Sequence, residues 1–204
     1  MDILNSIKQI QALSEIGVHY SHNDFDLQRY QEIGRLSTEA IAGILDLPVQ
    51  TVRNRMEEHD GYKTAKVDVR AVVFNEQNEI LMVREKIDDC WSLPGGWADV
   101  GYTPSEVAVK EAREEAGARV TPVRLLAVLD KRCHPHPSDL YYIYKIFIEC
   151  TLDGWVDRDL LETSAAGFFP ENQLPALSLP RNTEEQIAML FDFRHGRITA
   201  PVFD

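Results

Sequence analysis

Cysteine is scarce in this chain of 204 residues, which contains only Cys90, Cys133 and Cys150. Their number is odd and no two have CxxC spacing, which argues against a disulfide framework and against a structural zinc site. We therefore expect all three to be small, buried, apolar side chains. Stability must come from apolar burial, and 44% hydrophobic residues at this length allow one good core and a smaller second one.

Basic residues are also few, because 21 Lys and Arg stand against 33 Asp and Glu and give a formal net charge of −12. Binding to nucleic acid or to an anionic membrane requires a basic surface, so the composition argues against both partners. A phosphate-bearing substrate would need a metal ion to supply positive charge. No apolar run is long enough to span a membrane, and the opening segment MDILNSIKQIQAL has no basic region. We expect a cytoplasmic protein.

Residues 1–62 are predicted to form a small all-helical N-terminal domain. Apolar residues recur at helical spacing on both sides of the polar segment HNDFD, and a third helix is expected after Pro48. One interpretation of TVRNRMEEH is a DNA-recognition helix, but the acidity of the module favours a packing or dimerisation element. The periodic apolar residues are Ile3, Ile7, Ile10, Leu13, Ile33, Leu36, Ala40, Ile41, Ile44 and Leu45.

The period changes at Lys66, where a second domain covering residues 66–204 is predicted to begin. KVDVRAVVF alternates as a strand does, and EILMVRE follows the polar turn NEQN, which together predict a β-hairpin. Further strands are expected at 123–129, 141–150 and 167–169, and a last helix at 182–193. Strands mixed with two helices predict an α/β domain with an α/β/α layered architecture.

One helix of this domain has clear boundaries in the sequence. Thr103-Pro104-Ser105-Glu106 is a capping box with Pro at the first helical position, and Gly117 suits the C-terminal end. Three glutamates at i, i+3 and i+4 project from one side of this helix, beside an alanine stripe that permits close packing on a sheet. The glutamates are Glu111, Glu114 and Glu115, and the alanines are Ala108, Ala112 and Ala116.

The crowded carboxylates predict a metal site. Mg²⁺ takes oxygen ligands and accepts substrate phosphates in its shell, and the backbone of Gly95 and Gly96 can direct a carbonyl oxygen at the same ion. The alternative is an ordinary solvated helix face, as most charge runs are. The Gly-Gly turn ahead of the helix and the alanine stripe beside the acids favour the metal site.

The segment that begins at Gly96 resembles the Nudix box, G-x5-E-x7-R-E-U-x-E-E-x-G-U, in which U is a bulky apolar residue. The resemblance implies a Nudix α/β/α sandwich with a mixed sheet, and hydrolysis of a nucleoside diphosphate linked to another moiety. It implies Mg²⁺, which Mn²⁺ can replace, held by the three glutamates and a carbonyl of the Gly-Gly turn. A carboxylate would take the proton of the attacking water. The implied catalytic residues are Glu111, Glu115 and, outside the box, Glu162 as the nearest downstream acid.

Four positions depart from the box: Tyr102 replaces Glu, Lys110 replaces Arg, and Ala112 and Ala118 replace bulkier residues. In the family, the Glu and Arg resemble a structural ion pair. We expect Tyr102 and Lys110 to compensate for each other, because Lys110 can instead reach an acid four residues away, Glu106 or Glu114.

The layout of nearly the whole chain is similar to the bacterial Nudix subfamily that acts on X-linked nucleoside diphosphates, such as CDP-choline or ADP-ribose. The features are the helical N-terminal region, VDVRAVVF, WSLPGGWADVG and LSLPRNTEEQI. The helical domain is predicted to form a homodimer and to border the substrate, so deleting residues 1–61 should lower the oligomeric state or expose an apolar surface. Two alternatives remain: a Nudix-like module that senses a nucleotide, and a hydrolase of RNA ends.

Substrate contacts are expected from two sources. The loop DKRCHPHPSDLYY combines basic and aromatic side chains suited to a nucleotide rim, although an ordinary surface loop is equally compatible with it. Two basic residues on strands could reach the phosphates, or could pair with a structural acid such as Asp68 or Glu149. The predicted substrate-binding residues are Lys131, His136 and Tyr142 from the loop, and Arg70 and Lys145 from the strands.

Overall fold

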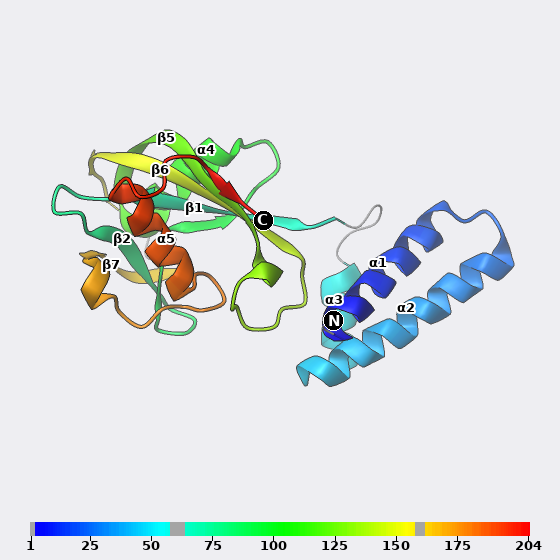
Figure 1. Ribbon diagram of the computed structural model, residues 1–204. Coiled ribbons are helices and arrows are strands. Elements are labelled where there is room, and N and C mark those ends of the chain that lie inside the picture. The colour runs from blue at the N-terminus through cyan, green and yellow to red at the C-terminus, as the bar shows by residue number, and fades with distance from the viewer. Residues whose placement is uncertain (1–2, 58–63, 158–161) are drawn as a thin grey trace. The chain divides into compact units, whose positions relative to one another are not determined.

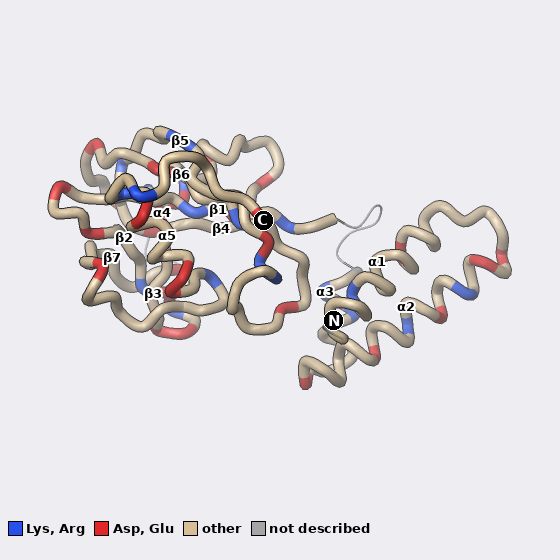
Figure 2. Tube along the Cα trace, in the orientation of Figure 1, with Lys and Arg blue, Asp and Glu red and all other residues tan. Residues whose placement is uncertain are grey.

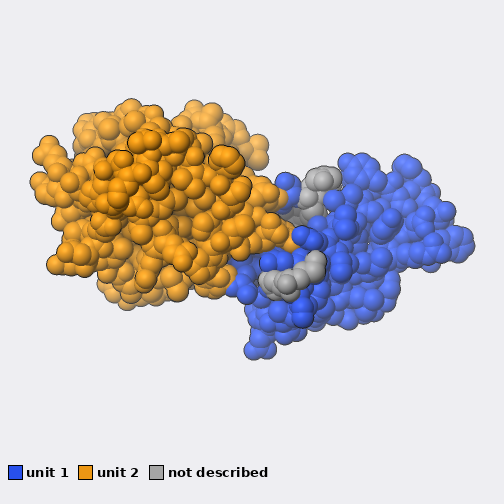
Figure 3. Space-filling model, in the orientation of Figure 1, with its two compact units in different colours: residues 1–64, 138–141 blue, residues 65–137, 142–204 orange. Residues whose placement is uncertain are grey.

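The computed structural model describes residues 3–57, 64–157 and 162–204. The chain divides into two compact units (Figure 3). The helical unit contains Met1–Thr64 together with Ser138–Tyr141, and the sheet unit contains Ala65–Pro137 and Tyr142–Asp204. In the described residues no helix is long and apolar enough to cross a membrane.

The helical unit consists of three helices and one returning segment. The helices are α1 (Ile3–Tyr20), α2 (Asp24–Leu45) and α3 (Val49–Glu57). Leu140 joins residues of the three helices in a buried apolar cluster, and the Lys8 ammonium donates to the carbonyl oxygens of Asp139 (3.0 Å) and Tyr141 (2.9 Å). The segment Ser138–Tyr141 is therefore part of this core. Its other buried apolar members are Leu4, Ile41, Ala42 and Val52.

Most of the apolar stripe of α1 points away from the unit's own core, although Ile7 packs against that core. The buried face of α1 carries Leu4 and the polar residues Lys8, Gln11 and Ser14. By contrast, Ile3 and Leu13 are 70% and 66% exposed, and Phe25 on α2 is 72% exposed. Charged residues of both signs alternate along α2 (Figure 2), where Arg29 pairs with Asp26, and Arg35 with Glu32 and Glu39. The helical unit thus leaves apolar surface uncovered beside a solvated, charged face.

The sheet unit contains a five-stranded sheet in the order β4-β1-β6-β5-β8 and a three-stranded sheet in the order β3-β2-β7 (Figure 1). The first is mixed, because β1 pairs parallel with β6 and antiparallel with β4. The strands are β1 (Lys66–Val73), β2 (Ile80–Glu85), β3 (Trp91–Ser92), β4 (Gly95–Trp97), β5 (Ala118–Asp130), β6 (Ile143–Trp155), β7 (Thr163–Phe169) and β8 (Val202–Phe203).

The predicted hairpin between β1 and β2 is wrong. The two strands belong to different sheets, and Phe74, just after β1, forms an isolated bridge with Ile80 of β2. The longest pairing of each strand is with a strand far along the chain: β1 pairs with β6, and β2 pairs with β7. Short-range alternation cannot reveal such partners.

Two helices cover opposite faces of the sheets, which gives the expected α/β/α sandwich. The helix α4 (Pro104–Ala116) packs its alanine stripe against Val69 and Ala71 of β1 in one core. The helix α5 (Glu184–Arg194) packs Ile187 and Phe191 against the other face, where Val72 lies. The cysteines are all free, but only Cys150 is buried; Cys133 is exposed and Cys90 half-buried, so the expectation of three buried thiols is wrong for two of them.

Candidate active site

The helix α4 begins and ends where the sequence predicts. The Thr103 hydroxyl accepts from the backbone N–H of Glu106, and the Glu106 carboxylate accepts from the N–H of Thr103 at 2.8 Å. At the other end, Gly117 adopts a left-handed conformation with φ of 70°. These caps fix the helix at both ends and hold its last two turns, which carry the glutamates, in one place.

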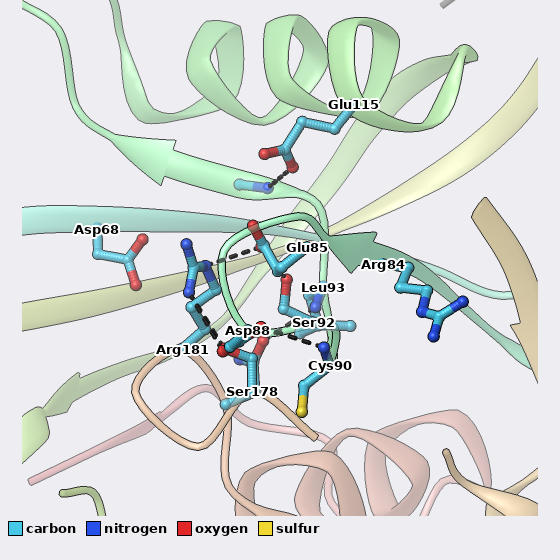
Figure 4. Close-up of polar contacts among 12 residues, drawn as sticks. Asp68, Arg84, Glu85, Asp88, Cys90, Ser92, Leu93, Glu115, Ser178 and Arg181 are labelled. Atoms are coloured by element: carbon cyan, nitrogen blue, oxygen red, sulfur yellow. Dashed lines mark hydrogen bonds and ion pairs between the residues drawn. The ribbon is translucent and has the colours of Figure 1, made fainter. Parts of the chain in front are cut away.

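Glu115 is tied directly to the Gly-Gly turn. Its Oε2 accepts from the backbone N–H of Gly95 at 2.8 Å (Figure 4), and its backbone carbonyl accepts from the Thr163 hydroxyl at 2.8 Å. Gly95 has φ of 154°, and a Cβ there would lie 2.1 Å from the Val69 carbonyl oxygen. Only glycine fits this position, because any side chain would collide with the β1 backbone.

Glu111 lies over the second glycine of the turn. A Cβ on Gly96 would lie 3.2 Å from Oε1 of Glu111, so the absent side chain leaves room for that carboxylate. Burial raises the pKa of Glu115 to about 8; the charges of Glu85 and Glu111 add to the rise, while Arg70 opposes it. Burial also raises the pKa of Glu111. The two carboxylates are thus close together and poorly hydrated, a state that a cation would relieve.

The other predicted metal and catalytic acids lie further out. The Glu114 side chain is 54% exposed and lies 3.9 Å from the Lys110 ammonium. Glu162 is exposed, just ahead of β7. In the described part of the chain, no three acidic, His or Cys side chains are gathered closely enough to hold an ion. The oxygen donors of Glu111, Glu115 and the Gly95–Gly96 turn fit Mg²⁺ chemically, and roles for Glu114 and Glu162 stay predictions.

Arg70 and Lys145 both pair with Asp68 in a buried cluster. Nη2 of Arg70 lies 2.7 Å from Oδ1 of Asp68, and the Lys145 ammonium contacts Oδ2. Arg70 also donates to the Leu93 carbonyl at 3.0 Å. The alternative that these two cations pair with a structural acid is therefore correct for Asp68. The other acid considered, Glu149, pairs with Arg124 instead. Phosphate contacts by Arg70 and Lys145 stay predictions, and both side chains are almost fully buried.

The loop residues predicted to line a nucleotide rim have partners within the sheet unit. Nδ1 of His136 lies 2.6 Å from the Leu179 carbonyl oxygen, and Nε2 lies 3.0 Å from the Gln186 amide. Burial lowers the pKa of His136 to about 4, and the charges of Lys145 and Lys131 contribute to this. The loop therefore docks on the segment before α5, with Lys131 and Lys145 nearby. Tyr142 is half-buried, with the Arg132 guanidinium 5.0 Å from its ring centre.

A second polar cluster, which the sequence did not predict, lies below Glu115 (Figure 4). Oε1 of the buried Glu85 accepts from the Ser92 hydroxyl at 2.6 Å and pairs with Nε of Arg181 at 2.8 Å. The Asn182 Oδ1 accepts from the Leu93 N–H at 2.9 Å. The clue in the sequence was the segment LSLPRNTEEQI, whose polar residues before α5 hold the strand that leads into the Gly-Gly turn.

Lys110 finds a partner that the sequence did not suggest. Its ammonium lies 2.9 Å from Oδ2 of Asp99, 3.9 Å from Glu114 and 5.9 Å from the centre of the Tyr102 ring. Glu106 is engaged in the capping box, so of the two expected partners only Glu114 is in reach. Asp99, in the loop ahead of the helix, supplies a carboxylate that joins the loop to α4.

We expect Tyr102 and Lys110 to be energetically coupled. Tyr102→Glu alone would place a carboxylate beside Asp99, and Lys110→Arg alone would gain little. The double variant should be more stable than the sum of the single variants implies, by roughly 0.5 to 3 kcal/mol in unfolding free energy, the range for residues in contact. Urea unfolding of all four proteins measures this, and additive effects would contradict it.

Comparison with known proteins agrees with this geometry. The α/β/α sandwich carries a capped helix whose glutamates lie against a glycine turn. This combination is the one expected of a pyrophosphohydrolase of the Nudix class. The model of the NUDIX domain matches residues 64–192, more than half the chain, and the model of the UDP-X-like N-terminal oligomerisation domain matches residues 1–56. The chain therefore belongs to the Nudix hydrolase family, within the subfamily that acts on X-linked nucleoside diphosphates. Hydrolases of this family generally use a divalent metal ion.

Three relatives are similar over much or all of their length. "Putative ADP-ribose pyrophosphatase YjhB" of Bacillus subtilis (strain 168) is 43% identical over 201 residues, which cover 98% of this chain and 96% of the relative. The crystal structure of a UDP-X diphosphatase is 31% identical with a TM-score of 0.64, covering 100% of this chain and 98% of that one. An ADP-ribose pyrophosphatase from Streptococcus suis 89-1591 is 41% identical with a TM-score of 0.62, covering 69% and 100%.

Proposed function

We propose that the protein is a Mg²⁺-dependent pyrophosphohydrolase that cleaves the diphosphate of a nucleoside diphosphate linked to another moiety. ADP-ribose, CDP-choline and UDP-linked compounds are the candidate substrates, and the products are a nucleoside monophosphate and a phosphorylated second group. One observation supports this most strongly: the carboxylates of Glu111 and Glu115 lie against the Gly95–Gly96 turn. The similarity to the "Putative ADP-ribose pyrophosphatase YjhB" and to a UDP-X diphosphatase supports the substrate class.

The chain's own residues would bind the metal ion, orient the substrate and deprotonate the attacking water. Glu111, Glu115 and a carbonyl of the Gly-Gly turn would hold the Mg²⁺, which would neutralise diphosphate oxygens and make the attacking water more acidic. The capped ends of α4 keep these acids in place. A carboxylate at the edge of this group would accept the proton of the attacking water. The buried pair of Arg70 and Asp68 fixes the Leu93 carbonyl, and with it the approach to the turn.

A panel of compounds tests the proposal. ADP-ribose, CDP-choline and a UDP-sugar are each incubated with the protein and Mg²⁺, and the products are resolved by mass. We expect AMP, CMP or UMP from at least one of them, and no release after exhaustive chelation. Mn²⁺ should restore activity to the chelated protein. Full activity after chelation, or no turnover of any compound, would contradict the proposal.

We also propose a cytoplasmic homodimer formed through the helical unit. The N-terminal family model is described as an oligomerisation domain, and Ile3, Ile10 and Leu13 of α1 form an exposed apolar stripe. Covering such a stripe in a second copy removes apolar surface from water. Deleting residues 1–61 is a poor test, because it would also uncover Leu140, which belongs to the same core.

Leu13→Glu should weaken this dimer without unfolding the helical unit. Leu13 is 66% exposed and outside the buried cluster, so the charge would disturb only a partner surface. Light scattering after gel filtration should move toward the 23.2 kDa monomer. Gln9→Glu, which adds the same charge at an exposed position of α1, should keep the dimer. An unchanged mass for Leu13→Glu would exclude this stripe as the interface.

A further inference from the structure

The basic side chains expected near the phosphates are almost wholly withdrawn from solvent. Arg70 is 5% exposed, Lys145 is 1% exposed and Lys131 is 7% exposed. Arg70 and Lys145 are already paired with Asp68. A diphosphate substrate is negatively charged, and a guanidinium with accessible N–H groups can donate charge-assisted hydrogen bonds to its oxygens. A phosphate contact from this region therefore requires another cation that is accessible to solvent.

Arg181 meets this requirement. Its side chain is 27% exposed, while Glu85, its ion-pair partner, is only 5% exposed. Nε lies 2.8 Å from Oε1 of Glu85, and Nη1 donates to the Ser178 hydroxyl at 3.1 Å. Nη1 also lies 3.8 Å from Oδ2 of Asp88. Within the described chain these are the contacts of the guanidinium, so Nη2 has no protein partner there.

The partners of Arg181 are themselves fixed. The Ser178 hydroxyl donates to Oδ2 of Asp88 at 2.6 Å, and the backbone N–H of Arg181 donates to the backbone carbonyl of Ser178 at 2.8 Å. Glu85 is the last residue of β2 and is held by the Ser92 hydroxyl. A long flexible side chain is thus held in one orientation before any ligand arrives, which lowers the entropic cost of binding.

The guanidinium of Arg181 points toward Glu85, whose charge in turn acts on Glu115. Figure 4 shows it directed toward the region between Asp68 and Glu85, with Glu115 on the far side of Glu85. Glu85 is near enough to Glu115 and Arg70 for its charge to raise the pKa of both groups. Ser92, which binds Glu85, lies three residues before Gly95 in the sequence. Arg181 and the Gly-Gly turn are therefore parts of one connected polar network.

We propose that Arg181 binds a phosphate oxygen of the diphosphate substrate through its outer N–H groups, with Glu85 and Ser178 as the residues that position it. This inference rests on the proposed function and names a substrate contact for it. A planar guanidinium suits phosphate oxygens, and the buried Glu85 keeps its Nε side occupied so that the Nη side faces outward. Glu85 acts through Arg181 and touches no substrate atom.

Steady-state kinetics on the compound turned over fastest tests this role, with Arg181→Gln, Arg181→Lys and the wild type. We expect Arg181→Gln to raise KM roughly 10- to 100-fold, the loss of one charged hydrogen bond. The kcat value and the Mg²⁺ concentration for half-activity should stay near wild type, while Tm should fall in both variants that disturb the pair, because the buried Glu85 loses its ion-pair partner. Arg181→Lys should recover part of the loss, because the charge remains while the planar fork does not.

Arg84→Gln is the matched control. Arg84 precedes Glu85 on β2 and is 42% exposed, but pairs with Asp89 at 2.5 Å. Its KM should equal that of the wild type. A KM for Arg181→Gln within twofold of wild type, or a fall in kcat and Tm without a rise in KM, would overturn the inference. If Arg181→Gln does not fold, a wild-type KM for Arg181→Lys would overturn it as well. A wild type inactive on every compound would instead overturn the proposed function.

Discussion

Glu115→Gln is expected to lower kcat/KM by several orders of magnitude in a chain that still folds. The amide keeps a carbonyl oxygen that can accept from the Gly95 N–H, so the 2.8 Å bond to the turn can survive. The negative charge that would face the metal ion is lost. Kinetics at saturating Mg²⁺, with circular dichroism as the check on folding, measures the effect.

A control variant and a minimum loss of activity define the test of Glu115→Gln. Glu76→Gln, in the exposed turn after β1, should leave kcat/KM unchanged, because this acid lies outside the site. A loss below about tenfold for Glu115→Gln, equal to about 1.4 kcal/mol of barrier, would show that another acid carries the role. Glu111→Gln would then be the variant to measure.

Asp68→Ala is expected to cause the largest loss of stability. It would leave the buried cations Arg70 and Lys145, which are 5% and 1% exposed, without their shared carboxylate. Breaking a buried pair from one side costs about 3 to 5 kcal/mol, so Tm should fall by roughly 6 to 20 °C. Burial lowers the pKa of Lys145 to about 8 even with Asp68 present. Thermal and urea unfolding measure the change.

The exposed pair of Arg124 and Glu149 provides the comparison. Nε of Arg124 lies 2.6 Å from Oε2 of Glu149, on the same sheet, but the two side chains are 40% and 19% exposed. Glu149→Ala should cost less than about 1 kcal/mol, because solvent can hydrate the remaining charge. Equal losses for Asp68→Ala and Glu149→Ala would contradict the assignment of the buried cluster as a stabilising element.

Features encoded within a few residues of one another could be predicted from the sequence. The capping box, the C-terminal Gly117 and the alanine stripe all depend on helical spacing, and the structure places each as expected. The Nudix class followed from the same short segment.

Features that depend on distant partners could not be predicted. Asp68 and Lys145 are 77 residues apart, and Leu93 and Asn182 are 89 apart, so neither pair has a local signature. The separation of β1 and β2 into two sheets has the same origin, since their pairing is decided by β6 and β7. Arg181 was missed for this reason: its importance comes from Glu85, on a strand formed much earlier in the chain.

The returning segment Ser138–Tyr141 affects the order in which the protein can fold during synthesis. A ribosome releases the three helices first, yet their core includes Leu140, and Lys8 is anchored by the carbonyls of Asp139 and Tyr141. The helical unit therefore cannot complete its core until residue 141 has emerged, when β1 to β5 have already been made. Although it comes first in the sequence, it is completed only alongside the sheet unit, so nascent helices wait with apolar surface exposed.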